Sequence, residues 1–266
     1  MYPKEIFLGL DLYAICMCVG IFLCILAFSL LADRIKIRAK LQKFCFVCAI
    51  FAIPLGYFSS VLFQALYNIK ERAGFVMSSS TGTTFYGGLI GGAAVFLAIY
   101  FIAGHFMFPD GYHESQFFRM SSCAAISITL AHGFGRIGCL MAGCCHGKAT
   151  EAWYGIVMNG GKYVPVQLFE AIFLFLLCGI MIFLLLKGKT LNLPLYLISY
   201  GIWRFFIEYA RGDYRGDTFV SFLSPSQLTA VVLAACGVGL LIFERIYTKK
   251  HSERNECVFG RNETGE

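Results

Sequence analysis

Two arginines stand inside apolar segments, where a charged side chain needs a specific reason. Arg136 lies in the glycine-rich stretch His132–Gly147, and Arg204 lies in a second apolar segment. An arginine at the centre of a bilayer costs about 2.5–3.5 kcal/mol on insertion scales, so it is kept only with an anionic partner or a wet cavity. Two such cations indicate a site for a negative group, and the commonest large anion in a bilayer is a phospholipid headgroup.

The segment around Arg204 places several polar groups on one helix face. At about 100° per residue, these side chains fall within about 80° of one another: Tyr200, Arg204, Glu208 and Arg211. Arg204 and Glu208 are four residues apart, and Glu208 and Arg211 are three apart, the spacings at which helical side chains meet. A structural ion pair would explain part of this face. Two arginines against one carboxylate leave a positive charge over, however, and arginine holds a phosphate through paired hydrogen bonds.

Two further polar residues open the next apolar segment upstream. Gln167 and Glu170 follow Pro165, and proline is common at helix starts. Glu170 could neutralise one of the buried arginines. A local structural role for this pair is at least as plausible as a catalytic one.

Three cysteines and a histidine form a C-x4-C-C-H cluster: Cys139, Cys144, Cys145 and His146. As metal ligands they need a fourth partner and a wider spacing than adjacent cysteines offer, because zinc sites usually contain C-x2-C. As a redox pair, Cys139 would bridge to one of the other two, since adjacent cysteines bridge poorly. Otherwise they are small residues that line a site. His146 could act as a general base or could simply be solvated.

Glycines gather at the start of another apolar segment. Gly87 with Gly91, and Gly88 with Gly92, have the small-xxx-small spacing that lets helices approach closely. Helix packing and close approach of a lipid are both consistent with this pattern.

The composition indicates that these residues lie in a membrane protein. The chain has 266 residues, of which 58% are hydrophobic and 14% charged. Soluble domains carry about 25% charged residues, so the chain is expected to be an integral membrane protein of the all-α, polytopic class. Apolar runs long enough to span a bilayer, about 20 residues each, predict seven transmembrane helices at 10–31, 44–66, 86–103, 118–138, 166–186, 194–210 and 226–243.

The loop charges predict the orientation and the domain plan. Lysines and arginines number 12 on one side of the predicted spans and seven on the other, and the richer side should be cytoplasmic. The N-terminus is therefore expected outside and the C-terminus inside. We expect one transmembrane domain, 1–245, with outward-facing loops 67–85, 139–165 and 211–225, and a polar cytoplasmic tail, 246–266. The charge pattern carries no nucleic-acid signature, and the cysteines form no disulfide framework because most lie in apolar runs.

Five motifs, in order along the membrane domain, resemble those of the prolipoprotein diacylglyceryl transferases. They are Asp11-Leu12-Tyr13-Ala14, Phe85-Tyr86-Gly87-Gly88-Leu89-Ile90-Gly91, Gly135-Arg136-Ile137-Gly138, Pro165-Val166-Gln167-Leu168-Phe169-Glu170 and Tyr200-Gly201-Ile202-Trp203-Arg204-Phe205-Phe206-Ile207-Glu208. The resemblance implies transfer of a diacylglyceryl group from phosphatidylglycerol to the lipobox cysteine of a prolipoprotein signal peptide, with release of glycerol 1-phosphate. It implies a multi-pass protein of the bacterial plasma (inner) membrane, and no metal or organic cofactor.

The residues and the resemblance together define a candidate site. Catalytic roles are expected for Arg136, Arg204, Tyr86, His146 and Glu208. Substrate-binding roles are expected for Tyr13, Gly87, Gly88, Gly138, Cys139, Cys144, Gly147, Gln167, Tyr200 and Arg211. The two buried arginines would hold the phosphate and stabilise charge as the C–O bond breaks.

The chain departs from the family pattern at the signature. Where the family has two asparagines and a glutamate after Gly138, this chain has Cys139, Ala142 and Cys144, and Tyr86 replaces a histidine. The base that deprotonates the thiol is therefore open between Tyr86, His146 and an arginine-activated water. Three alternatives remain: a relative that uses another acceptor, a lipid translocator, and a thiol-redox membrane protein.

Overall fold

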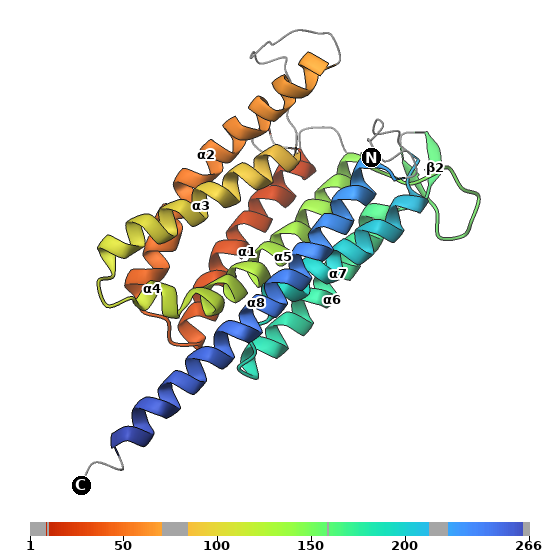
Figure 1. The fold of residues 1–266 in the computed structure, drawn as a ribbon. Coiled ribbons are helices and arrows are strands. Elements are labelled where there is room, and N and C mark those ends of the chain that lie inside the picture. Colours follow the sequence, from red (N-terminus) through yellow and green to blue (C-terminus); the bar gives the residue numbers. More distant parts are fainter. Residues whose placement is uncertain (1–8, 10, 71–84, 159, 213–222, 263–266) are drawn as a thin grey trace. The chain divides into compact units, whose positions relative to one another are not determined.

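The computed structural model describes residues 9, 11–70, 85–158, 160–212 and 223–262, and at 67–70, 85–86 and 251–262 it describes the backbone alone. The chain divides into two compact units, residues 1–31 with 118–266 and residues 32–117. The predicted all-α class is confirmed (Figure 1). The single-domain boundary at residue 245 stays a prediction, and α8 carries the helix through most of the expected tail.

The elements are as follows. The helices are α1 (Leu12–Arg34), α2 (Ala39–Lys70), α3 (Phe85–Met107), α4 (Tyr112–Ser115), α5 (Phe117–Ala142), α6 (Val166–Leu186), α7 (Asn192–Ile207) and α8 (Pro225–Asn262), with a 3-10 turn at Glu208–Ala210 and two short strands, β1 (Ile156–Met158) and β2 (Gly161–Tyr163).

Among the described residues, six helices are long and apolar enough to cross a membrane, namely α1, α2, α3, α5, α6 and α8. The segment 194–210, which the sequence also predicted as a span, is not among these six helices. It forms α7, whose 16 residues extend about 24 Å, against about 30 Å for a bilayer core. Its last turn tightens into the 3-10 turn Glu208–Ala210. The multi-pass class is confirmed, whereas the number of spans and the side of each terminus stay predictions.

In the second unit, α2 and α3 lie side by side along a glycine seam (Figure 1). A side chain at Gly87 would meet Phe63 at 2.6 Å, and one at Gly91 would collide with Ser59. The Ser59 hydroxyl also donates to the Gly87 carbonyl at 2.9 Å. Because these contacts run in opposite directions along the two helices, the pair is antiparallel. The close packing favours the helix-packing interpretation of these glycines.

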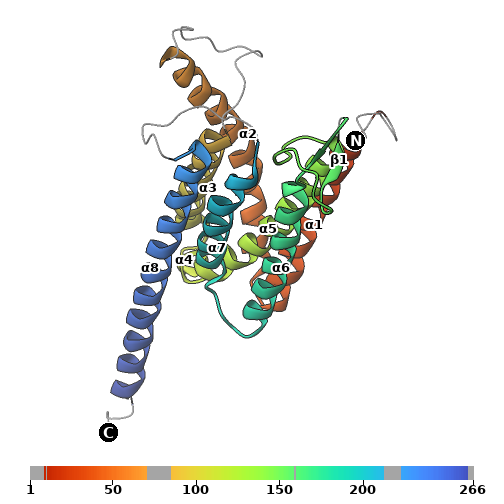
Figure 2. The same cartoon turned by 90° about the vertical axis from the view of Figure 1, so that its right-hand side faces the viewer.

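In the first unit, α5 is a shared packing surface. A side chain at Gly133 would meet Phe175 of α6 at 2.6 Å, and one at Gly138 would meet Tyr13 of α1 at 3.2 Å. The pair α7 and α8 lies side by side in both views (Figures 1 and 2). Gly201 permits that contact, since a side chain there would lie 2.7 Å from the Ala230 carbonyl oxygen. Small residues thus set where α5 and α7 meet their neighbours.

The loop expected at 139–165 contains structure that joins the ends of α5, α6 and α7. The strands β1 and β2 pair antiparallel, with Met158 opposite Gly161. Gly147 donates its N–H to the Val164 carbonyl at 2.8 Å, and the next residue, Lys148, donates to Ala210 at 2.9 Å. The segment after α5 is therefore tied to the end of α7.

Candidate functional site

Glu170 is the centre of the first group of polar side chains. Its carboxylate Oε1 lies 3.0 Å from Arg136 Nη2 and accepts a hydrogen bond from the Tyr200 hydroxyl at 2.8 Å. His132 Nε2 lies 3.9 Å from the same oxygen. The Glu170 side chain is 1% exposed and that of Arg136 19%. Three helices, α5, α6 and α7, therefore bring one carboxylate, one guanidinium, a phenol and an imidazole together inside the unit.

Arg204 and Glu208 form the second group at the end of α7. Arg204 Nη2 lies 2.9 Å from Glu208 Oε2, which confirms the contact predicted from the four-residue spacing. Arg211 Nε lies 3.9 Å from the same oxygen, as the three-residue spacing predicted.

The start of α8 completes this group. Ser226 Oγ lies 3.1 Å from Arg204 Nη2, and the Ser224 hydroxyl donates to Glu208 Oε1 at 3.2 Å. Ser224 also caps α8, because its Oγ accepts the Gln227 N–H at 3.2 Å while Gln227 Oε1 accepts the Ser224 N–H at 3.0 Å. This reciprocal pattern is a capping box. It fixes the start of α8, where Ser226 contacts Arg204 of α7.

The two groups are electrostatically linked through Glu170. The Glu170 carboxylate interacts electrostatically with both Arg136 and Arg204. The two groups together hold three guanidinium groups and two carboxylates, so one positive charge remains if the imidazole is neutral. The structure therefore keeps the surplus positive charge that the sequence predicted. Glu170 is the carboxylate that neutralises Arg136, as proposed for one of the buried arginines.

Each central guanidinium keeps an unused donor. Arg136 Nε and Arg204 Nη1 are buried and have no hydrogen-bond partner among the described residues. A buried donor without a partner costs free energy comparable to a lost hydrogen bond, about 1–3 kcal/mol and more for a charged group. The two arginines, drawn from α5 and α7, therefore retain capacity for an anion.

The three cysteines of the C-x4-C-C-H cluster meet at the end of α5. The Sγ atoms of Cys139, Cys144 and Cys145 all lie within 4.8 Å of one another. Hydrogen bonds from the Cys139 thiol and the Arg211 guanidinium lower the pKa of Cys145 to about 5. Burial raises the pKa of Cys144. Cys145 and Cys144 are therefore adjacent thiols whose pKa values are shifted in opposite directions.

His146 does not join the three thiols in that group. Its Nδ1 lies 3.0 Å from the Gly147 carbonyl oxygen, and its ring stacks on Tyr163 with centroids 3.9 Å apart. Because a carbonyl can only accept, Nδ1 is the donor in this contact, and in a neutral imidazole with this tautomer the lone pair is on Nε2. That tautomer suits a general base at Nε2.

The remaining predicted site residues occupy packing positions. Gln167 is buried and donates to the Cys144 carbonyl at 2.6 Å. Gly147 has no room for a side chain, since one would lie 2.6 Å from the Ala210 carbonyl oxygen. Tyr13 packs on Gly138 between α1 and α5.

Three predicted residues, Tyr86, Gly87 and Gly88, lie at the start of α3 in the second unit. Gly87 and Gly88 face α2, and the side chain of Tyr86 lies outside the described residues. A part in substrate binding stays a prediction for these residues.

His132, Ser224 and Ser226 belong to the two polar groups but were not predicted as site residues. The signal for Ser224 was present, because Ser-Pro-Ser-Gln has the spacing of a capping box with proline at the first helical position. His132 precedes Arg136 by four residues and thus shares its helix face.

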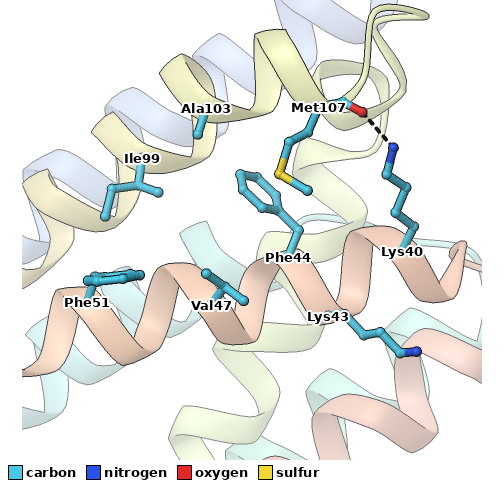
Figure 3. Close-up of a pocket in the computed structure, with 8 residues that line it drawn as sticks. All are labelled: Lys40, Lys43, Phe44, Val47, Phe51, Ile99, Ala103 and Met107. Atoms are coloured by element: carbon cyan, nitrogen blue, oxygen red, sulfur yellow. Dashed lines mark hydrogen bonds between the residues drawn. The ribbon is translucent and has the colours of Figure 1, made fainter.

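The second unit has a separate apolar groove of about 370 Å³ between α2 and α3 (Figure 3). Phe44, Val47 and Phe51 of α2 face Ile99, Ala103 and Met107 of α3. Lys40 closes one end by donating to the Met107 carbonyl at 2.7 Å. None of the predicted site residues lines this groove.

Comparisons with known proteins agree with the motifs. The family model described as "Prolipoprotein diacylglyceryl transferase" matches residues 5–243. A phosphatidylglycerol–prolipoprotein diacylglyceryl transferase of Clostridium tetani is 30% identical over 82% of this chain and 88% of that protein. Proteins of the same name from Dehalococcoides mccartyi and Clostridioides difficile are each 29% identical, over 91% and 93% of this chain and 92% and 95% of theirs.

Proposed function

Because the chain belongs to the prolipoprotein diacylglyceryl transferase family, we propose that it transfers a diacylglyceryl group from phosphatidylglycerol to a cysteine thiol of a prolipoprotein. In this reaction a C–S bond forms at the glyceryl carbon and the C–O bond to phosphate breaks. The thiol loses its proton to a base, and the phosphate leaves with its second glycerol as glycerol 1-phosphate.

The observation that carries the site assignment is the pair of unused donors on Arg136 and Arg204. A phosphodiester accepts hydrogen bonds from guanidinium groups and becomes more negative as the C–O bond breaks. Donors fixed in a water-poor site stabilise such developing charge strongly. Tyr200, through Glu170, orients Arg136, and Glu208 orients Arg204.

His146 is our candidate for the base. The Gly147 carbonyl accepts from Nδ1, so in the neutral imidazole Nε2 would be the nitrogen that accepts the thiol proton. Its ring is partly exposed beside the hairpin formed by β1 and β2, so an incoming peptide could reach it. Tyr86 and an arginine-activated water remain the alternatives from the sequence.

This assignment also implies an acceptor and a cellular location for the reaction. The acceptor would be the lipobox cysteine of a signal peptide, and the protein would lie in the bacterial plasma membrane with its N-terminus outside. The loop charges and the family motifs support this placement.

The test uses purified protein in detergent with phosphatidylglycerol and a prolipoprotein. Product is followed by mass, and glycerol 1-phosphate release is followed separately. We expect Arg136→Ala and Arg204→Ala each to slow both readouts by about 10²-fold or more, the cost of removing one charge-stabilising group. Arg38→Ala, which removes an exposed pair with Asp110 in the second unit, is the control and should retain wild-type rates.

Wild-type rates in either arginine variant would reject the site. Lipid binding without glycerol 1-phosphate release by the wild type would instead favour the translocator alternative.

A further inference from the structure

The three clustered thiols have a geometry that the family reaction does not use. In that reaction the attacking thiol belongs to the substrate, so the enzyme needs none of its own. Cys139, Cys144 and Cys145 nevertheless converge from the end of α5 and the following turn. Other cysteines, such as Cys48 of α2 and Cys178 of α6, are buried within helices and belong to no such group of three among the described residues.

The distances match a shared metal ion. Zinc–sulfur bonds are about 2.3 Å long, which places the ligand sulfurs of a tetrahedral site about 3.8 Å apart. The three Sγ atoms already lie within 4.8 Å of one another. Rotamer adjustments of less than about 1 Å would therefore bring them to bonding positions.

An unusual turn makes this convergence possible. Adjacent cysteines in extended or helical backbone point apart, which is why the spacing alone argued against a metal. Here Gly143 has φ 70° and Cys145 has φ 59°, both in the left-handed region. A non-glycine residue seldom adopts that conformation, and strain of this kind clusters at functional sites.

Neighbouring hydrogen bonds hold the turn in place. The Cys144 N–H donates to the Cys139 carbonyl at 3.1 Å, and buried Gln167 donates to the Cys144 carbonyl at 2.6 Å. The ligand positions are therefore organised before any ion arrives.

The charges around the three thiols favour a divalent ion over a monovalent one. Three thiolates and a divalent cation carry a net charge of −1, and the Arg211 guanidinium, whose side chain is 2% exposed, contacts Cys145. Arg211 also faces Glu208, so a divalent ion, whose complex carries −1, leaves less uncompensated negative charge than a monovalent ion, whose complex carries −2. Cys144 is exposed, so an ion can enter from solvent and a water can take the fourth position.

We propose that Cys139, Cys144 and Cys145 form a three-thiolate site for a soft divalent ion of the Zn²⁺ type, with the fourth coordination position open to water. The site adjoins the proposed reaction centre, because Arg211 contacts both Cys145 and Glu208. Because the site shares Arg211 with the Glu208 group, its test is chosen so that it needs no turnover.

The test is a titration of reduced, metal-free full-length protein in detergent with Co²⁺ as a spectroscopic probe. We expect one ion per chain, with a sulfur-to-cobalt charge-transfer band that Zn²⁺ abolishes. Cys145→Ser should weaken binding at least tenfold. Cys236→Ser, which changes an exposed cysteine of α8, is the matched control and should bind as the wild type does.

A second readout on the wild type covers the case in which a serine variant misfolds. Zn²⁺ should slow alkylation of these three cysteines, identified by mass spectrometry, and a chelator should restore it. Absence of a charge-transfer band in the wild type, or equal alkylation with and without Zn²⁺, would overturn the proposal. So would a disulfide between two of the three in protein isolated without reductant, an outcome that favours the redox interpretation.

Discussion

At the scale of single residues, the contribution of an ion pair to stability depends on its burial more than on the distance between its atoms. Arg38 Nη1 lies only 2.6 Å from Asp110 Oδ2, yet both side chains are more than half exposed. Arg136 lies farther from Glu170, at 3.0 Å, but the Glu170 side chain is 1% exposed. Water screens the first pair and leaves it little effect on stability. In the second pair, Glu170 is the only carboxylate that forms an ion pair with Arg136 among the described residues.

Replacing Glu170 by glutamine should therefore destabilise the protein strongly. The variant keeps the shape of the side chain but leaves Arg136 buried without its counter-charge, which costs about 3–5 kcal/mol. Thermal unfolding in detergent measures the effect. Asp110→Asn, the matched exposed change, should leave the unfolding temperature unaltered. Equal shifts in the two variants would show that burial of the Arg136 pair has no special weight.

The sequence revealed the charged residues of the site better than their partners. Arg136 and Arg204 were evident because a cation in an apolar run is costly. The contacts of Glu208 followed from helical spacing. His132, Ser224 and Ser226 were missed because their places depend on how α5, α7 and α8 pack, which helical periodicity within one segment does not encode.

At the scale of elements, the start of α8 positions the Arg204 group. Ser224 serves two purposes, since its hydroxyl oxygen caps the helix and also donates to Glu208. Helix position and carboxylate orientation are thus coupled through one side chain.

Ser224→Ala should accordingly affect both stability and activity. Loss of an N-cap costs about 1 kcal/mol, and Glu208 loses a partner that orients it toward Arg204. We expect a lower unfolding temperature and a slower transfer rate. Thr229→Ala, one turn further along, removes only a hydroxyl that bonds to the Pro225 carbonyl within the helix, and it should leave the transfer rate unchanged. A Ser224 variant with the wild-type rate would refute the positioning role of the α8 start.

The sequence predicted the existence of the helices more securely than their ends. The run 44–66 is part of α2, which extends over Ala39–Lys70, because an apolar window does not detect polar turns that continue a helix. In the run 194–210 the α-helix ends at Ile207 and the 3-10 turn Glu208–Ala210 follows. Ala210 and Arg211 then pair with Lys148 and Gly147, contacts that a helical pattern does not reveal. The hairpin of β1 and β2 was not predicted, since each strand has only three residues.

At the scale of the whole molecule, the balance of loop charges remains the basis for orientation. The cation-rich loops are expected in the cytoplasm, and the segment after α5 outside. This placement would put the thiol cluster and His146 on the outer side, where a translocated peptide arrives.

A matched pair of lysine-to-cysteine changes tests the orientation. Lys148 and Lys189 are both exposed and lie in loops predicted on opposite sides. A membrane-impermeant thiol reagent is added to intact cells, and labelling is assigned by mass spectrometry to residue 148 or 189, because Cys144 is also exposed. The reagent should label Lys148→Cys, and it should label Lys189→Cys only after the membrane is permeabilised. Labelling in the reverse order would invert the topology and move the proposed reaction to the cytoplasmic face.

We propose that Arg136 and Arg204 together hold the lipid phosphate, and the rest of the site depends on this contact. Dipolar coupling between guanidinium nitrogen and lipid phosphorus measures this contact directly, in ¹⁵N-arginine protein reconstituted with phosphatidylglycerol. We predict a nitrogen–phosphorus distance of about 4 Å, as expected for a guanidinium hydrogen-bonded to a phosphate. The coupling should weaken in Arg136→Lys and in Arg204→Lys and persist in Arg38→Lys. A coupling that is absent from the wild type, or unchanged in both of the first two variants, would contradict the account.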